Sequence, residues 1–340
     1  MLSRRGLKKI RPLFFSYLCT NNFLMIDDVR NTVLAIANKN NYGYISPQDF
    51  NLYCQQAQMD LFEDYFYQYN NWILKQNTRT SGSGYADIVK NLEEVIDLFS
   101  QEVFLTQVGV ANTYSLPADY YLINKLFYYP NSLASGTNTF VAAFKLTDST
   151  AVFSNLTNPT TPPVGSIIVN TTTGDQCYVT AVDDSTTLSI SANIMNLNDA
   201  YIIYSNTNIA EVERVSQNKL FYLTSSPLTA PSNQFPAYVL DANTITVYPS
   251  TIDGSRSVKT QYIRYPLPPK WTYSIISATE GTPVFNENQL DYQDFELPLS
   301  DEPTLVAKIC QYVGIEIREE DVYTFGTTGV TQENTEENAQ

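Results

Sequence analysis

The stretch from Ile36 to Tyr69 limits the possible folds more than any other part of this chain, because it joins two helical segments through a glycine turn. Ser46, Pro47 and Asp49 predict a helix start, with serine at the N-cap, proline at the first helical position and an acid facing the exposed amides. Two apolar stripes follow at helical spacing: Phe50, Tyr53, Cys54, Ala57, Leu61 and Tyr65, then Leu52, Met59, Phe62, Phe66 and Tyr69. Such a helix indicates a crowded bundle or a subunit contact, or else a helix central to its own domain.

The composition excludes many enzyme classes. None of the 340 residues is histidine, which removes serine–histidine and cysteine–histidine catalysis, histidine-ligated metals and the usual proton shuttle at neutral pH. The 35 acidic and 20 basic residues give a formal net charge of −15, so the surface as a whole should repel nucleic acid. Any DNA beside this protein is expected to be guided without sequence-specific binding.

Aromatic and cysteine residues point to contacts rather than chemistry. The chain has 25 tyrosines beside many Asn, Thr and Ser residues, a mixture that favours broad, hydrated interfaces, although tyrosines on strands explain part of this number. Cys19, Cys54, Cys177 and Cys310 lie far apart without a CxxC pair. We expect free, mostly buried thiols in a reducing compartment.

The basic N-terminus resembles a signal peptide only in part. Basic residues precede the apolar run from Leu13 to Leu18, but Pro12 interrupts the transition and no small-residue cleavage site follows. No other segment approaches the roughly 18 apolar residues of a membrane-spanning helix. The sequence therefore predicts a soluble chain with no membrane partner and with a basic extension over residues 1–24.

The rest of the chain divides where the composition and the apolar period change, and its fold class is α+β. We expect an N-terminal helical bundle with an inserted small antiparallel β-barrel or sandwich, an antiparallel strand set and a C-terminal helix. The expected parts are a first helical core (25–136), the inserted β domain (137–206), a β-rich return to the core (207–298), the C-terminal helix (299–326) and a polar tail (327–340) that stays disordered until a partner holds it.

Within these parts, several elements are expected individually. The helical core contains helices over Asp27–Asn38 and Tyr85–Phe99 besides the capped one. The strands expected in the inserted domain are Phe140–Leu146, Ile167–Asn170, Cys177–Val182, Thr187–Ser191 and Ala200–Tyr204. The return to the core contains Glu211–Tyr222, Thr244–Tyr248 and Val258–Tyr265 as an antiparallel set. Gly314 is expected to end the last long helix, and a second short turn of helix is expected over Arg318–Phe325.

One segment imitates a calcium site. Residues 38–49 have the glycine and hydrophobic spacing of a calcium loop, but the ligand positions hold the neutral Asn38, Asn40 and Tyr42 and the short Asp49. The same residues are typical of the turn between two helices. We expect no calcium binding.

Other acidic residues also have a structural interpretation. Glu93, Glu94 and Asp97 lie opposite an apolar helical stripe, and Asp183 and Asp184 fall in a predicted hairpin turn, where aspartate is a turn former. The sequence contains no GxGxxG, GxxxxGK[ST] or GxSxG motif. We expect no enzyme, with no catalytic, cofactor-binding or metal-ligating residues and no cofactor, although a two-carboxylate hydrolase is formally open.

Four blocks, in this order, resemble a known family. They are Val33–Asn70 (with the motif NKNNYGYISPQDF), Val164–Tyr204, Phe235–Trp271 and Leu305–Gly326. Together they resemble head-to-tail connector proteins of crAss-like and other tailed bacteriophages. The family pattern begins close to Met25, so either Met25 is the true start or residues 1–24 add a contact to portal, cargo or DNA.

This resemblance implies a virion structural protein that is made in the host cytoplasm. It would be an adaptor or ring protein beneath the portal at the phage head–tail junction, a homo-oligomer of twelve copies through whose lumen the genome leaves the capsid. Its partners would be other copies of itself, the portal protein, and other ring or tail proteins. The alternative from the residues themselves is a tail-associated adhesion or carbohydrate-binding module, suggested by Tyr, Trp, Asn and Asp on β-rich segments.

Overall fold

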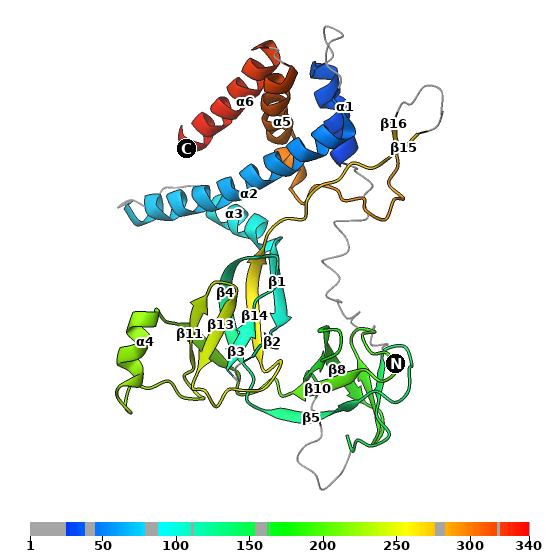
Figure 1. Cartoon of the computed structure of the whole chain (residues 1–340), viewed down its shortest axis with the longest axis vertical. Helices are drawn as coiled ribbons and strands as arrows, with labels where there is room; N and C mark the ends of the chain where they lie inside the picture. Colours follow the sequence, from blue (N-terminus) through cyan, green and yellow to red (C-terminus); the bar gives the residue numbers. More distant parts are fainter. Residues whose placement is uncertain are drawn as a thin grey trace, which may run out of the picture. The chain divides into compact units, whose positions relative to one another are not determined.

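The computed structural model (Figure 1) describes residues 25–37, 45–78, 88–109, 112–153, 162, 164–275, 283–317 and 320–339. The chain forms two compact units. The helical unit contains Met1–Val95 and Pro266–Gln340, and the β unit contains Ile96–Tyr265. Long helices and multi-stranded sheets in one chain confirm the predicted mixed α+β class.

The helical unit is built around one buried helix. Its elements are α1 (Met25–Ala37), α2 (Pro47–Thr78), a hairpin of β15 (Tyr273–Ile275) and β16 (Pro283–Phe285), the short 3₁₀ helix η2 (Leu299–Asp301), α5 (Glu302–Ile317) and α6 (Glu320–Ala339), while α3 (Ile88–Asp97) crosses the boundary between the units. Helix α5 packs against α1, α2 and α6. Its residues Leu305, Ile309, Cys310 and Val313 are fully buried, so α5 is the centre of this core.

The predicted start of α2 is confirmed, and its two apolar stripes have different surroundings. The amide of Asp49 donates to the hydroxyl of Ser46, as expected for an N-cap. The first stripe lies almost entirely inside the helical unit, whereas in the second Phe62 is buried but Leu52 is 62% exposed. The first stripe therefore belongs to a helix central to its own domain, and any contact between subunits has to use other surfaces.

An irregular segment after Pro266 binds the first two helices together through Trp271. The indole Nε1 of Trp271 donates to Asp27 on α1, and its backbone pairs in both directions with the side-chain amide of Asn51 on α2. The guanidinium of Arg30 lies 3.9 Å from the centroid of the Trp271 ring. One tryptophan thus connects α1 to α2.

The β unit contains an eight-stranded sheet with the order β1-β14-β4-β11-β12-β13-β3-β2. The strands are β1 (Ser100–Phe104), β2 (Thr106–Gln107), β3 (Thr113–Ser115), β4 (Tyr120–Tyr128), β11 (Ala210–Arg214), β12 (Ala237–Asp241), β13 (Thr244–Tyr248) and β14 (Val258–Arg264). The edge strands β1 and β2 are separated only by the buried Leu105. Because consecutive strands occupy opposite edges, the sheet curves round its core as a barrel does.

A second, six-stranded sheet has the order β5-β10-β7-β8-β9-β6. Its strands are β5 (Ser132–Thr137), β6 (Lys145–Thr147), β7 (Ile167–Asn170), β8 (Gln176–Val182), β9 (Thr187–Ile190) and β10 (Ala200–Tyr204). The predicted strands from Ile167 onward agree with β7 to β10 within a residue at each end. The two sheets meet through an aromatic cluster in which the rings of Phe104 and Tyr204 stack at 5.7 Å.

Three sequence expectations for the β unit are wrong. The expected strand Phe140–Leu146 is strand only at its end, where β6 begins at Lys145; Phe140 makes a single bridge, and strand β5 was missed. The expected strand Glu211–Tyr222 ends at Arg214, and a helix, α4 (Gln217–Thr224), follows. The strand set is not wholly antiparallel, because β11 and β12 run parallel.

The C-terminal expectations also need correction. Gly314 does not end the last helix but lies inside α5, where an added Cβ would come within 2.5 Å of the backbone nitrogen of Tyr323. Its lack of a side chain serves the close packing of α5 and α6. The expected polar tail after residue 326 continues as α6 up to Ala339, because one side of that helix packs on α5.

Candidate interaction surfaces

The segment between β11 and β12 is the most unusual surface of the β unit, and we name Ser216–Phe235 the crossover arm. It begins with α4 and continues as a chain of turns. None of its residues is buried. In Figure 1, α4 stands clear of the strands that it connects.

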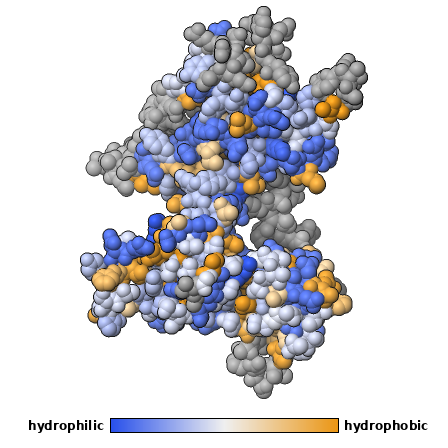
Figure 2. Space-filling model, in the orientation of Figure 1, coloured by the Kyte–Doolittle hydropathy of each residue, from blue (hydrophilic) through white to orange (hydrophobic). Residues whose placement is uncertain are grey.

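Large apolar side chains on this arm face solvent. Phe221 is 71% exposed, Tyr222 74%, Phe235 78% and Leu228 93%. Figure 2 shows hydrophobic surface on the part of the β unit where Figure 1 draws α4 and β11. Single exposed apolar residues are ordinary, but four large ones on one short connection make the arm a candidate interaction surface.

Local polar contacts give the arm its shape. The hydroxyl of Ser216 accepts from the amide of Lys219 as the N-cap of α4, and the Ser225 amide and hydroxyl both donate to the carbonyl of Phe221. Farther on, the Thr251 hydroxyl donates to the side chain of Asn233 at 3.0 Å. The arm is therefore shaped by capping and turn hydrogen bonds rather than by a core.

The loop between β5 and β6 forms a second exposed apolar surface. Phe140 is 63%, Val141 49% and Phe144 55% exposed. Phe144 has a φ of +58°, an uncommon backbone conformation for a bulky side chain. Its amide donates to the side chain of Asn193, which helps to hold that conformation.

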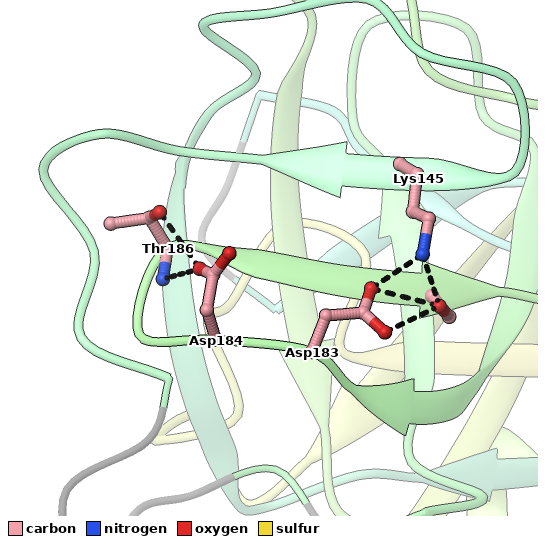
Figure 3. A network of polar contacts seen from close by, with 5 residues as sticks. Lys145, Asp183, Asp184 and Thr186 are labelled. Carbon is pink, nitrogen blue, oxygen red and sulfur yellow. Dashed lines mark hydrogen bonds and ion pairs between the residues drawn. The ribbon is translucent and has the colours of Figure 1, made fainter.

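Asp183 and Asp184 lie in the turn of the β8–β9 hairpin, as predicted. Figure 3 shows that the carboxylate of Asp183 points to Lys145, whose Nζ lies 2.6 Å away, while Asp184 points to Thr186. The hydrogen bonds from Lys145 and Ser189 lower the pKa of Asp183, and the backbone amide of Thr186 lowers that of Asp184. Both carboxylates are therefore ionised. Asp183 connects neighbouring strands through Lys145 and Ser189, whereas Asp184 stabilises the turn through Thr186.

The other acidic candidates, where the structure describes them, are surface or helix-capping residues. Glu93, Glu94 and Asp97 are exposed on α3, with Glu94 3.8 Å from Lys90 and Glu93 accepting from the hydroxyl of Tyr69. Of the calcium-like segment, residues 38–44 lie outside the described part of the chain, and Asp49 serves the start of α2. Among the described residues, no three His, Cys, Asp or Glu side chains lie close enough to hold a metal ion.

The cysteines in the described regions are free and buried, as expected from the sequence. These are Cys54, Cys177 and Cys310, while Cys19 lies outside those regions. Burial raises the thiol pKa of all three, to about 12 for Cys177 and Cys310. Thiols kept protonated in this way are poor nucleophiles.

Two other carboxylates, those of Asp148 and Asp294, are less exposed than Asp183 and Asp184 and stabilise the fold. Asp148 is buried and accepts from the hydroxyls of Tyr201 and Thr150. Burial raises its pKa, but these hydrogen bonds and those from the backbone amides of Thr150 and Ala151 outweigh burial, so the net direction of the pKa is down. Asp294 accepts from the amides of Met25 and Ile26 at the start of α1, and its burial raises its pKa. Sequence reasoning did not find either role, because each joins residues far apart in the chain.

None of the helices that the structure describes has the length and apolar content needed to cross a bilayer. Sequence reasoning also missed the crossover arm, although Ser216 before an apolar stretch was a usable N-cap signal.

No protein-family model matches this chain, and no curated protein matches it either.

Proposed function

We propose that this chain is a structural protein of a tailed bacteriophage virion that assembles into a ring at the head–tail junction, beneath the portal. In this proposal it is a connector, or adaptor, without catalysis. Copies contact one another, the portal protein and neighbouring ring or tail proteins. Twelve copies are the number that the family resemblance implies.

One observation carries the proposal: the protein presents large apolar side chains on protruding segments, while its candidate chemical groups serve the fold. The exposed side chains lie on the crossover arm and on the β5–β6 loop. Asp183, Asp184 and the buried thiols are engaged or protonated. Exposed apolar side chains on several surface segments suit a protein whose function is to bind other protein subunits.

The charge of the chain suits a channel for DNA. A formal net charge of −15 makes the protein repel phosphates overall, so genome passing through a ring of such copies would slide without lasting contacts. The order of the four sequence blocks supplies the link to the head–tail junction.

The proposal is tested on purified full-length chain, alone and mixed with the portal protein of the same phage. We expect closed rings in electron micrographs and a single high-mass species in native mass spectrometry. A chain that stays monomeric in both samples at all accessible concentrations would exclude the connector function.

A second candidate function is adhesion to a glycan. It is favoured by exposed aromatic side chains on the six-stranded module, where Phe140 is 63% and Tyr178 48% exposed. Aromatic faces bind sugars by stacking. A glycan array probed with the full chain tests this alternative, and binding lost in a Tyr178→Ala variant would support it over the connector.

A further inference from the structure

The connection between β11 and β12 differs from an ordinary parallel crossover. The two strands are neighbours and run parallel, pairing Glu213 with Ala237 and Arg214 with Tyr238. In a parallel unit of this kind the crossover helix normally packs its apolar side on the sheet. Here α4 lies in that position along the chain, yet it has no buried residue.

The arm carries enough apolar surface for a specific interface. An aromatic side chain buries roughly 150–250 Å² when fully covered, so the exposed Phe221, Tyr222 and Phe235 together with Leu228 amount to roughly 500–600 Å². One side of a standard protein interface covers about 800 Å². The arm therefore supplies most of one side of such an interface before any neighbouring residue is added.

The charge of the arm indicates the kind of surface that it meets. Between Ser216 and Phe235 the only charged residue is Lys219, whereas the whole chain has a net charge of −15, which leaves −16 for the rest (−15 minus +1). A phosphate backbone or an anionic membrane is recognised by clusters of Lys and Arg, which the arm lacks. A strongly acidic protein surface accepts an acid-free arm without repulsion between like charges.

We propose that the crossover arm is the element by which one copy of this chain docks on a second copy. This inference rests on the proposed ring function, and it names the surface that closes the ring. The arm of each copy docks on the acidic surface of the next copy, a head-to-tail contact that repeats around a closed ring. Phe221, Tyr222, Leu228 and Phe235 are the anchors, and Lys219 favours the acidic neighbour.

The first test replaces the four anchors together with serine (Phe221→Ser, Tyr222→Ser, Leu228→Ser, Phe235→Ser). A matched control carries four serine substitutions at exposed apolar positions outside the arm and the β5–β6 loop (Val152→Ser, Val164→Ser, Leu197→Ser, Leu290→Ser). We expect sedimentation velocity to show assembled wild type and assembled control, but an arm variant whose apparent dissociation constant rises at least ~100-fold. Circular dichroism and thermal unfolding check that all three fold.

The outcomes separate this inference from the proposed function. Assembly of the arm variant at the wild-type concentration overturns the role of the arm and leaves the ring function standing. A wild type that is monomeric, alone and with portal, overturns both. If the fourfold variant does not fold, the single change Phe221→Asp at an exposed position gives the same comparison.

A second measurement identifies the occupant directly. A photo-crosslinking amino acid replaces Leu228, and ¹⁴N-labelled and ¹⁵N-labelled chains are mixed before irradiation. Cross-links between a light and a heavy peptide place the arm on a second copy. Cross-links found only within light or within heavy chains would place it on its own chain and overturn the inference.

Discussion

Helices α4 and α5 place their apolar residues in opposite environments. In α5, Leu305, Ile309 and Val313 are fully buried and the helix contacts three others. In α4, no residue is buried and Phe221 and Tyr222 face solvent. An apolar helix in this chain is therefore not by itself a core helix: α5 is stabilised by packing, whereas α4 depends on its caps.

The largest expected effect is on stability and comes from truncating the centre of α5. Ile309→Ala removes a side chain that is 0% exposed, and we expect the free energy of unfolding to fall by about 2–5 kcal/mol. Phe221→Ala in α4 should change it by less than about 0.5 kcal/mol, because the ring is 71% exposed. Urea unfolding of both variants measures the contrast, and equal losses would show that α4 is covered in the free chain.

The next effect concerns the close approach of α6 to α5. A Cβ added at Gly326 would lie 2.6 Å from the carbonyl oxygen of Ala307 and 2.6 Å from the amide nitrogen of Gln311. Gly326→Ala should therefore destabilise the unit by about 1–3 kcal/mol, despite the higher helix propensity of alanine. Hydrogen exchange should show α6 opening first. Thr328→Ala, at an exposed position of α6, serves as the control, and a stabilising Gly326→Ala change would mean that the two helices are not packed closely.

A smaller effect on stability is expected from the side-chain hydrogen bond that connects α5 to α2. The hydroxyl of Tyr312 donates to Asp60 on α2, so Tyr312→Phe should cost about 1 kcal/mol at neutral pH. Burial, together with the hydrogen bond to Asp60, raises the pKa of Tyr312 to about 12. Because the folded-state pKa lies above the ordinary value of about 10, this contribution is fully present below pH ~10 and is lost as the pH rises through ~12.

The measurement is the stability difference between wild type and Tyr312→Phe from pH 7 to pH 12. We expect the difference to be constant up to pH ~9 and then to shrink. Tyr222→Phe on α4 is the matched control and should give no difference at neutral pH, because its ring is 74% exposed. A Tyr312 difference that grows with pH would contradict the assignment of this hydrogen bond.

The smallest global effect is expected at the cap of α4. Ser216→Ala removes the side chain that accepts from the amide of Lys219, a loss worth about 0.5–2 kcal/mol to the helix itself. Since α4 buries nothing, we expect faster amide exchange from Leu220 to Thr224 with an unchanged midpoint of global unfolding. A large drop in that midpoint would show that α4 is part of a cooperative core.

Sequence patterns predicted the elements whose signals are local. The cap at Ser46, strands β7 to β10 and the buried thiols all follow from short-range spacing and residue type. The C-terminal helix was predicted with too early an end, because Gly314 carries the same signal whether it ends a helix or lets a second one approach. The turn role of Asp183 and Asp184 was also predictable, since aspartate forms turns through its own nearby amides.

The sequence by itself determined the α+β class, the change from helical to alternating apolar period, and a composition that disfavours histidine chemistry, because these depend on neighbouring residues and on residue type alone. Only the tertiary structure decided that β11 and β12 run parallel, that Asp294 and Trp271 hold the first helices, and that α4 lies uncovered. Such features depend on contacts between residues far apart in the chain. The free energy of such contacts depends on which side chains pack together in the folded protein. A local sequence pattern does not contain that information.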